Sequence, residues 1–299
     1  MDNIIARYED YLIHTKHASA NTVSSYMRDI RQYASYLSGI DVDVLEADQS
    51  VVSAYMQWLQ SIGKSPATVS RCLASLKSLY LFALSEDEIE QNPVHNIKVE
   101  KAEKKLPQIL TGKEVELLLE QPRTSDMKGC RDKAMLEVLY ATGIRVSELI
   151  NLNVQDINLR TGKLFCRGTK GVRTIPIYAK AVVAVSDYLY RMRDLIVDPD
   201  NSGDALFVNL NGSRLTRQGF WKIIKAYTAE AGITKEITPH TLRHSFAMHL
   251  LQGGASVKDI QTMMGHADIS STQVYVHLLD LDNHVKSVYN ECHPRAKTS

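Results

Sequence analysis

The feature that most constrains this chain of 299 residues is a short charged segment that interrupts it after residue 97. Residues 98–105, KVEKAEKK, contain almost no apolar side chains and follow the helix-breaking pair Asn92–Pro93. Because such a segment cannot be buried in a hydrophobic core, it predicts a linker between two separately folded domains. We therefore expect an N-terminal domain at residues 1–97, a linker at 98–106 and a second domain at 107–299.

The N-terminal region has the apolar spacing of helices throughout. A first helix is expected near residues 4–12, and apolar side chains recur at helical spacing over residues 23–37. A third helix covers about residues 51–62, and a fourth opens with Ser65 as N-cap and Pro66 at its first position. These signals predict a compact four-helix unit.

The second domain is expected to be mostly helical, with one β-hairpin. Helical spacing recurs in five segments, near residues 112–119, 128–140, 144–152, 182–196 and 217–231. Residues 163–177, KLFCRGTKGVRTIPI, instead contain two strand-like stretches around a glycine-flanked turn, which predicts a hairpin. A two-stranded ribbon is marginal alone in water, so it should pack on helices or reach a ligand. The predicted fold class is mainly α, with a small β-hairpin or sheet.

Composition excludes several other classes of protein. The formal net charge is only +1, so a surface that binds nucleic acid would have to be a local basic face. No apolar run approaches the ~20 residues of a membrane helix, and the first residues carry charge instead of an apolar signal core. The cysteines lie far apart and form no CxxC pair, which argues against a zinc ribbon or a disulfide framework: Cys72, Cys130, Cys166 and Cys292. We expect a cytoplasmic protein without a membrane partner.

Three histidines and one arginine gather in the stretch ITPHTLRHSFAMHL, residues 237–250. His240 and Arg243 are three residues apart near the start of a helix expected from about Leu242, so they can share one face. A helix start also favours anions through its free N–H groups and its dipole.

A zinc site is the main alternative for the same histidines. His240, His244 and His249 are metal ligands by type, but the HExxH motif needs a glutamate where Thr241 stands. Without that match, His244 is expected to be structural or to support a neighbour, and His249 to be an ordinary helix histidine.

Two further helices are predicted by the capping-box patterns that begin at Ser256 and Ser270. The first ends at Gly265, which leaves His266 just past its end. The second carries Tyr275 in its second turn.

Four motifs in this order resemble the tyrosine recombinase (phage integrase) family: R-V-S-E-L at 145–149, H-T-L-R-H at 240–244, G-H at 265–266, and Tyr275 nine residues later. The resemblance covers nearly the whole chain and is greatest to the Xer branch. It implies a SAM-like four-helix core-binding domain that clamps DNA, followed by a mostly helical catalytic domain.

The resemblance implies that Tyr275 attacks a DNA phosphodiester, leaving a 3′-phosphotyrosyl bond and a free 5′-hydroxyl. Arg145 and Arg243 match the two arginines of the family, and their planar guanidinium groups suit the non-bridging oxygens of the transition state. Because these side chains supply positive charge, neither a metal nor a cofactor is implied. Three other tyrosines lack the Gly-His spacing: Tyr178, Tyr227 and Tyr289.

Proton transfer is assigned by the same match. His240 corresponds to the histidine that assists proton transfer, and His266 to the one that hydrogen-bonds the phosphate. Lys170 in the hairpin turn corresponds to the general acid that protonates the leaving 5′-oxygen. Lys163 at the hairpin entrance is the alternative, because the turn is shorter than the G-K-G-x-K-x-R form of many relatives. Glu148 either orients a neighbouring arginine or is solvated.

The activity implied is site-specific recombination of double-stranded DNA through a Holliday junction, by a homo- or hetero-tetramer on its target site. The segment after Tyr275 would dock on a neighbouring subunit; the alternative is that it folds back on its own domain. A type IB topoisomerase-like relaxing enzyme, a DNA-binding protein that has lost cleavage and a histidine–metal protein are the alternatives. Chromosome-dimer resolution and mobile-element integration or excision are both compatible with the sequence.

Overall fold

The structure, a computed structural model, describes residues 2–99, 107–168, 171–198, 200, 203–266 and 268–280. The chain divides into two compact units, residues 1–105 and residues 106–299. Two sequence-based assignments lie outside the described residues: the general acid Lys170, and the docking segment after Tyr275 from residue 281 onward.

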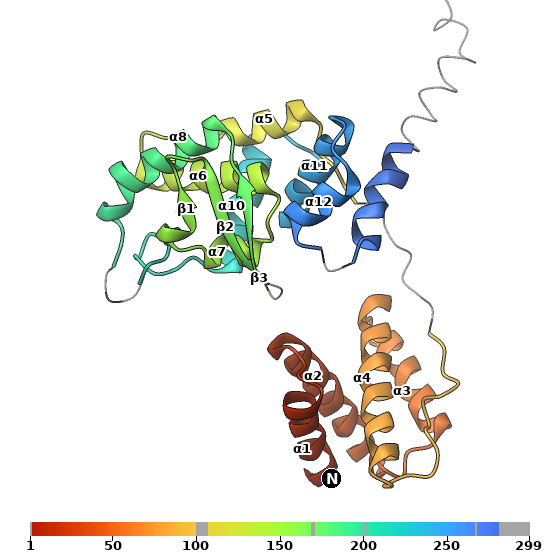
Figure 1. Cartoon of the computed structure of the whole chain (residues 1–299). Helices are drawn as coiled ribbons and strands as arrows, with labels where there is room; N and C mark the ends of the chain where they lie inside the picture. The colour runs from red at the N-terminus through yellow and green to blue at the C-terminus, as the bar shows by residue number, and fades with distance from the viewer. Residues whose placement is uncertain are drawn as a thin grey trace, which may run out of the picture. The chain divides into compact units, whose positions relative to one another are not determined.

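The first unit is a bundle of four α-helices, as predicted (Figure 1). Their bounds are α1 Asp2–Asp10, α2 Ala20–Ser38, α3 Gln49–Ser61 and α4 Pro66–Ser85, and a π-helical turn, Tyr11–Thr15, follows α1. The last three helices begin at side chains that cap a free backbone N–H group: Ser19, Asp48 and Ser65. The bundle closes around a core rich in tyrosine, in which the hydroxyl groups of Tyr33 and Tyr80 hydrogen-bond to each other at 2.9 Å.

The second unit is mostly helical and contains one small sheet, also as predicted (Figure 1). Its helices are α5 Gly112–Glu120, α6 Met127–Thr142, α7 Val146–Asn151, α8 Ala179–Asp187, α10 Arg217–Glu230, α11 Pro239–Gln252 and α12 Val257–Met264. A final described helix covers residues 270–280.

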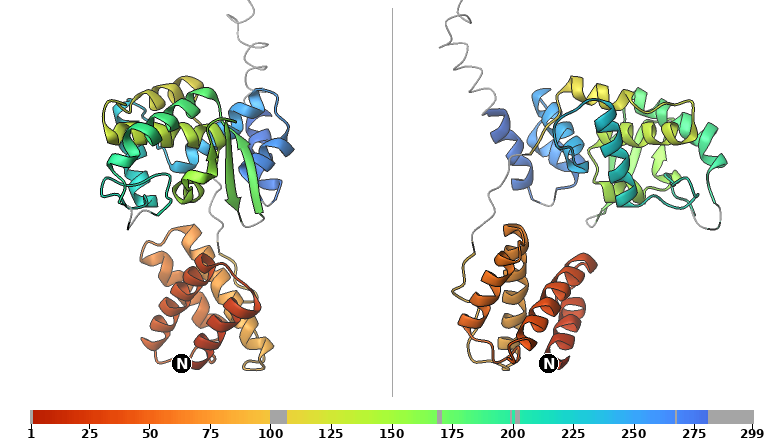
Figure 2. Two further views of the ribbon diagram at one scale, coloured as in Figure 1. Left: turned by 60° about the vertical axis from the view of Figure 1, so that its left-hand side comes forward. Right: turned by 180° about the vertical axis from the view of Figure 1, so that it is seen from behind.

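The sheet contains the predicted hairpin and one additional strand. Strands β1 Ile157–Asn158, β2 Lys163–Gly168 and β3 Gly171–Pro176 form an antiparallel sheet in that order. In the β2–β3 register, Gly168 pairs with Gly171, and Cys166 pairs with Arg173. Side chains of paired residues lie on the same face of a sheet, so Arg173 shares the face of the buried Cys166. In the left-hand view of Figure 2 the hairpin lies beside α12, which contacts β3.

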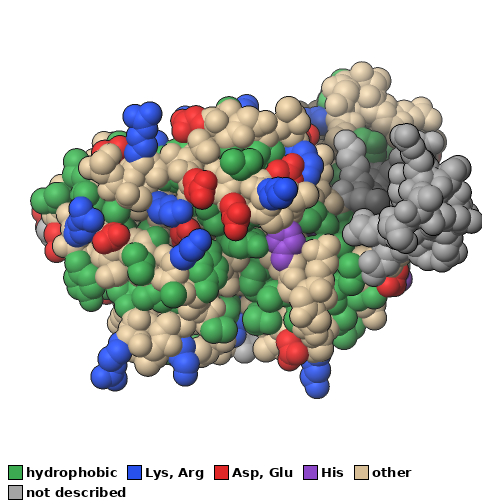
Figure 3. Space-filling model, turned by 90° about the horizontal axis from the view of Figure 1, so that it is seen from above, with side chains coloured by type: hydrophobic (Ala, Val, Ile, Leu, Met, Phe, Trp, Pro, Cys, Tyr) green, Lys and Arg blue, Asp and Glu red, His purple; other side chains and the backbone are tan. Residues whose placement is uncertain are grey.

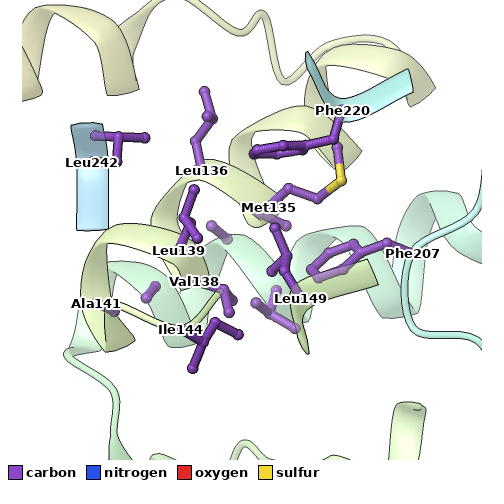
Figure 4. Close-up of a cluster of buried hydrophobic side chains, with 14 of the residues drawn as sticks. Met135, Leu136, Val138, Leu139, Ala141, Ile144, Leu149, Phe207, Phe220 and Leu242 are labelled. Atoms are coloured by element: carbon purple, nitrogen blue, oxygen red, sulfur yellow. The ribbon is translucent and has the colours of Figure 1, made fainter. Parts of the chain in front are cut away.

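The core of the second unit is built around α6, which is buried on nearly all sides (Figure 4). Leu136, Val138 and Leu139 of this helix meet Leu149 of α7 and Leu242 of α11 in one apolar cluster. Burying a leucine side chain contributes about 2 kcal/mol. The ends of α6, α7 and α11 are therefore held in place by a well-packed interior.

Two predicted helix boundaries and one predicted cap in this unit were wrong. Helix α11 begins at Pro239 and not near Leu242, because the Thr238 backbone N–H donates to the Thr241 hydroxyl and proline fits the first helical position. The helix over residues 270–280 begins at Ser270 as predicted, but Ser270 does not cap it: the carboxylate of the preceding Asp268 accepts both the backbone N–H and the hydroxyl of Ser270. The segment expected as a helix over residues 182–196 starts as α8 and continues as a π-helical turn and a 3₁₀ turn, Tyr188–Met192 and Arg193–Leu195.

The surface is mixed in charge. On the face drawn in Figure 3, Lys and Arg side chains alternate with Asp and Glu, which agrees with a net charge near zero. Within the described ranges, no helix combines the length and the apolar composition needed to cross a membrane.

Candidate active site

The C-terminal end of α12 is the point on which three arginine side chains converge. Its last carbonyl oxygens each accept a hydrogen bond from a different guanidinium group: Met263 from Arg173 at 2.8 Å, Met264 from Arg243 at 2.8 Å and Gly265 from Arg145 at 3.1 Å. The last carbonyls of a helix lack partners within the helix and carry the negative end of its dipole. Three cations from distant parts of the chain are thereby held within one helical turn.

Arg243 is the most deeply buried of the three, at 4 % exposed. Its other Nη atom donates to the carbonyl oxygen of Gly143, the residue that ends α6 with a φ of 58°. Burial, together with the charge of Arg145, lowers the pKa of Arg243 to about 10. The group is therefore a fixed cation at neutral pH.

Glu148 links Arg145 to Arg173. Its carboxylate accepts from the Arg145 backbone N–H at 2.7 Å and from Arg145 Nη1 at 3.3 Å, and it pairs with both Nη atoms of Arg173 at 3.0 and 2.9 Å. Burial alone would raise the pKa of Glu148, but the hydrogen bonds and charges of these arginines outweigh it and lower the pKa. Glu148 thus orients arginines, the first of its two predicted alternatives.

His266 follows directly after this helix end. Gly265 turns the chain with a φ of 64°, and His266 Nδ1 is hydrogen-bonded to the Thr272 hydroxyl at 2.8 Å. Burial, followed by the charges of Arg243 and Arg145, lowers the pKa of His266 to about 4. The ring is therefore neutral at pH 7, and the bond to Thr272 fixes its orientation.

Tyr275 is 2 % exposed, and its hydroxyl is hydrogen-bonded to Nδ1 of His244 at 2.7 Å. Burial raises the pKa of Tyr275, and the charge of Arg243 opposes that shift. Burial also lowers the pKa of His244 to about 4, with His240 and Arg243 acting in the same direction. The phenol is thus protonated and held by a neutral imidazole.

His240 and the two candidate lysines are less closely tied to this cluster. His240 lies in the first turn of α11, with its ring centre 6.3 Å from that of His244. Desolvation, and then the charges of Arg243 and Arg145, lower its pKa. Lys163 begins β2 at the end of the hairpin opposite the turn, paired with Pro176. Lys170 is not described.

A groove of about 870 Å³ opens over the cluster between the β2–β3 hairpin and α12. Arg145, Glu148 and His266 line it, together with three basic side chains that were not predicted: Arg167, Arg173 and Lys258. Exposed arginine and lysine side chains, such as Arg167 and Lys258 here, commonly bind phosphate backbones. Arg243 and Tyr275 are not among its lining residues and lie more deeply buried.

His240, His244 and His249 of α11 are not arranged as the ligands of one metal ion. His244 is bound to Tyr275, and His249 Nδ1 is hydrogen-bonded to the Tyr140 hydroxyl at 2.9 Å. Among the residues that the structure describes, no three His, Cys, Asp or Glu side chains are grouped so as to hold a metal ion.

Known proteins with the same organisation identify the chain. Residues 108–281 match the phage integrase family, and residues 5–87 match the N-terminal SAM-like domain of phage integrases. Tyrosine recombinase XerD of Oceanobacillus iheyensis is 45% identical over 282 residues, 93% of this chain and 94% of the relative. XerD of Listeria innocua is 41% identical over 302 residues, 99% of this chain and all of the relative.

The chain belongs to the phage integrase family. It is a tyrosine recombinase, an enzyme that breaks and rejoins DNA, as the resemblance of its motifs predicted. The fold of this recombinase is shared by the XerH site-specific recombinase bound to a palindromic difH substrate after cleavage, with a TM-score of 0.77 and 22% identity. That match covers 96% of this chain and 85% of XerH.

Two supporting residues of this recombinase were missed in the sequence. Arg173 lies on β3 two residues before the buried Ile175. Because alternate residues of a strand point to the same face, this spacing could have indicated that Arg173 points inward. Thr272 is 1 % exposed, and no local pattern connects it to His266 six residues earlier.

Proposed function

We propose that this recombinase cleaves DNA with Tyr275 as nucleophile. The phenolic oxygen forms a bond to the phosphorus, the bond from phosphorus to the 5′-oxygen breaks, and a 3′-phosphotyrosyl linkage stores the energy for rejoining. The observation that carries the proposal is the convergence of Arg145, Arg243 and His266 at the end of α12, next to the helix that presents Tyr275.

Arg145 and Arg243 stabilise the transition state. Negative charge grows on the non-bridging oxygens during the attack, and guanidinium groups held in place beforehand need no rearrangement to meet it. Because these side chains supply the positive charge, the proposed reaction requires no metal ion and no cofactor.

Proton transfer falls to the histidines and to the hairpin turn. In the tautomer whose Nδ1 accepts from the Thr272 hydroxyl, the neutral His266 carries its proton on Nε2 and can donate a hydrogen bond to a phosphate oxygen. His240 assists removal of the proton from Tyr275, and Lys170 protonates the 5′-oxygen as it leaves. The roles of His240 and Lys170 follow from the match of their positions to the family motifs.

Tyr275 has to leave His244 before it can attack. Its hydroxyl is buried and hydrogen-bonded to His244, whereas the groove that would hold the phosphate lies beside it. We propose that DNA binding releases the phenol towards the phosphate held by Arg145 and Arg243.

Recombination further requires two DNA sites. We propose a homo- or hetero-tetramer that exchanges strands through a Holliday junction, with the N-terminal domain, residues 1–97, clamping the DNA and the segment after Tyr275 docking on a neighbour. Removing residues 283–299 is expected to weaken recombination and pairing of sites more than binding to one site. A monomeric relaxing enzyme would instead change only DNA supercoiling.

In the cell, we propose that the protein acts on chromosomal DNA in the cytoplasm. Its similarity to XerD over nearly its whole length favours resolution of chromosome dimers over integration of a mobile element. Mapping the DNA bound in cells separates the two: one chromosomal site supports dimer resolution, and the ends of a mobile element support integration.

The test of the chemistry is a nicked substrate that carries the mapped site and traps the cleaved strand on the protein. The natural chain is expected to form a covalent adduct that survives denaturation, and Tyr275→Phe is expected to bind the same DNA without one. An adduct of undiminished yield in Tyr275→Phe would overturn the assignment.

A further inference from the structure

Each of the three guanidinium nitrogens of Arg173 is hydrogen-bonded inside the protein. Nε donates to the Met263 carbonyl at 2.8 Å, and the two Nη atoms donate to the two carboxylate oxygens of Glu148. The side chain is 14 % exposed. With each of its three nitrogens bonded to a protein oxygen and its side chain largely buried, Arg173 is poorly placed to bind a phosphate oxygen, although it lines the groove.

The contacts of Arg173 lead to two residues proposed to act on the phosphate. Through Glu148 it is connected to Arg145, which shares the same carboxylate. Through Met263 it holds the end of α12, whose next carbonyls accept Arg243 and Arg145. The fit is tight, since a Cβ atom on Gly265 would lie 2.8 Å from Cζ of Arg173.

We propose that Arg173 is a positioning residue for DNA cleavage. It keeps Glu148 ionised and aligned, and it ties the β2–β3 hairpin to the end of α12, so that Arg145 meets the scissile phosphate in a fixed orientation. This inference rests on the proposed function, because it assigns Arg173 a role through Arg145.

Arg173→Lys is the informative variant. Lysine keeps the positive charge, but a single ammonium group cannot span Met263 and both oxygens of Glu148 as the planar fork does. Arg193→Lys is the matched control: Arg193 lies in the same unit, is 12 % exposed and donates through Nε and Nη2 to the Ala205 carbonyl, outside the groove.

The experiment measures DNA affinity and the single-turnover rate of cleavage on two substrates. One carries the natural phosphate, and the other carries a methylphosphonate in which a neutral methyl group replaces one charged non-bridging oxygen. On natural DNA, Arg173→Lys is expected to bind normally and to cleave up to about 100-fold more slowly than Arg193→Lys, as for a small misplacement of a catalytic group. On methylphosphonate DNA this deficit is expected to shrink, because less charge develops for Arg145 to meet.

Three results would overturn the proposal: equal rates for the two lysine variants, an equal deficit on both substrates, or a loss of DNA affinity that accounts for the slower cleavage. If Arg173→Lys does not fold, Glu148→Gln tests the same chain of contacts at its centre and must show the same substrate dependence. Failure of the natural chain to form any adduct would instead contradict the proposed function.

Discussion

Replacing Gly143 with alanine is expected to destabilise the catalytic unit and to slow DNA cleavage. Gly143 ends α6 in the left-handed region of φ, and its carbonyl oxygen accepts a hydrogen bond from Arg243. A Cβ atom at this position would lie 2.2 Å from Cδ1 of Phe246, so the ring has to move. Phe246 and Arg243 are both on α11, and the displacement therefore reaches the proposed phosphate-binding cluster.

Gly232→Ala is the control that separates the collision with Phe246 from the strain of a left-handed backbone. Gly232 has a φ of 66°, and no atom of the described residues lies within 4 Å of its ideal Cβ position. Both variants have left-handed strain of roughly 1–2 kcal/mol, offset in part by about 0.4–1 kcal/mol from the stiffer unfolded chain. Overpacking adds roughly 1–3 kcal/mol at Gly143 alone. For a unit of this size, that places the Tm of Gly143→Ala roughly 2–12 °C below that of Gly232→Ala.

Scanning calorimetry of the full-length variants measures this difference, and a nicked substrate measures cleavage by the folded protein. A shift of α11 by about 1 Å is expected to slow cleavage by up to about 100-fold, whereas Gly232→Ala should cleave at the natural rate. Equal Tm values would refute the close contact with Phe246. A lower Tm with unchanged cleavage would refute the coupling between the end of α6 and Arg243.

Three further outcomes are expected. His244 and His266 have pKa values of about 4 in the folded protein, below the 6.5 of free histidine. Between pH 6.5 and 4 the unfolded chain therefore binds protons at these two rings that the folded protein does not bind. The free energy of unfolding should therefore fall as the pH drops from about 6.5 to about 4, and an equal slope in His266→Gln would contradict this. Thr272→Val should lose about 1 kcal/mol of stability and also slow cleavage, whereas Thr228→Val, which loses a buried hydrogen bond to Ile224, should lose stability alone. Cleavage should proceed in EDTA, and a requirement for a divalent ion in formation of the adduct would contradict a mechanism based on arginine side chains.

The elements that local chemistry dictates could be predicted from the sequence. Capping residues and Pro66 marked the start of α4, and a glycine-flanked turn marked the β2–β3 hairpin. Errors arose where two start signals overlapped. Pro239 was a stronger signal than the first apolar position of α11, and Asp268 displaced Ser270 as the cap of the last described helix.

The contacts of the site were harder to predict, because they join distant segments. Nothing local indicates that the carbonyls at 263–265 would accept three arginines, since this depends on how α7, β3, α11 and α12 pack. The partner of Tyr275 shows the same limit. The motifs correctly predicted that Tyr275 lies close to α11. They did not predict that His244 is the residue of α11 that hydrogen-bonds to its hydroxyl, because this depends on how the two helices pack.

The central claim is that Tyr275 becomes covalently joined to DNA, and the most direct measurement is to locate the joined residue. The natural chain is trapped on the nicked substrate and digested with trypsin and nuclease, and the peptide that retains nucleotide is identified by mass spectrometry. Cleavage after lysine and arginine places Tyr275 in the peptide 259–286 and the rival Tyr289 in the next one, 287–295. The account predicts that the nucleotide is on Tyr275 in the first peptide. Nucleotide on Tyr289, or on any other tyrosine, would contradict it.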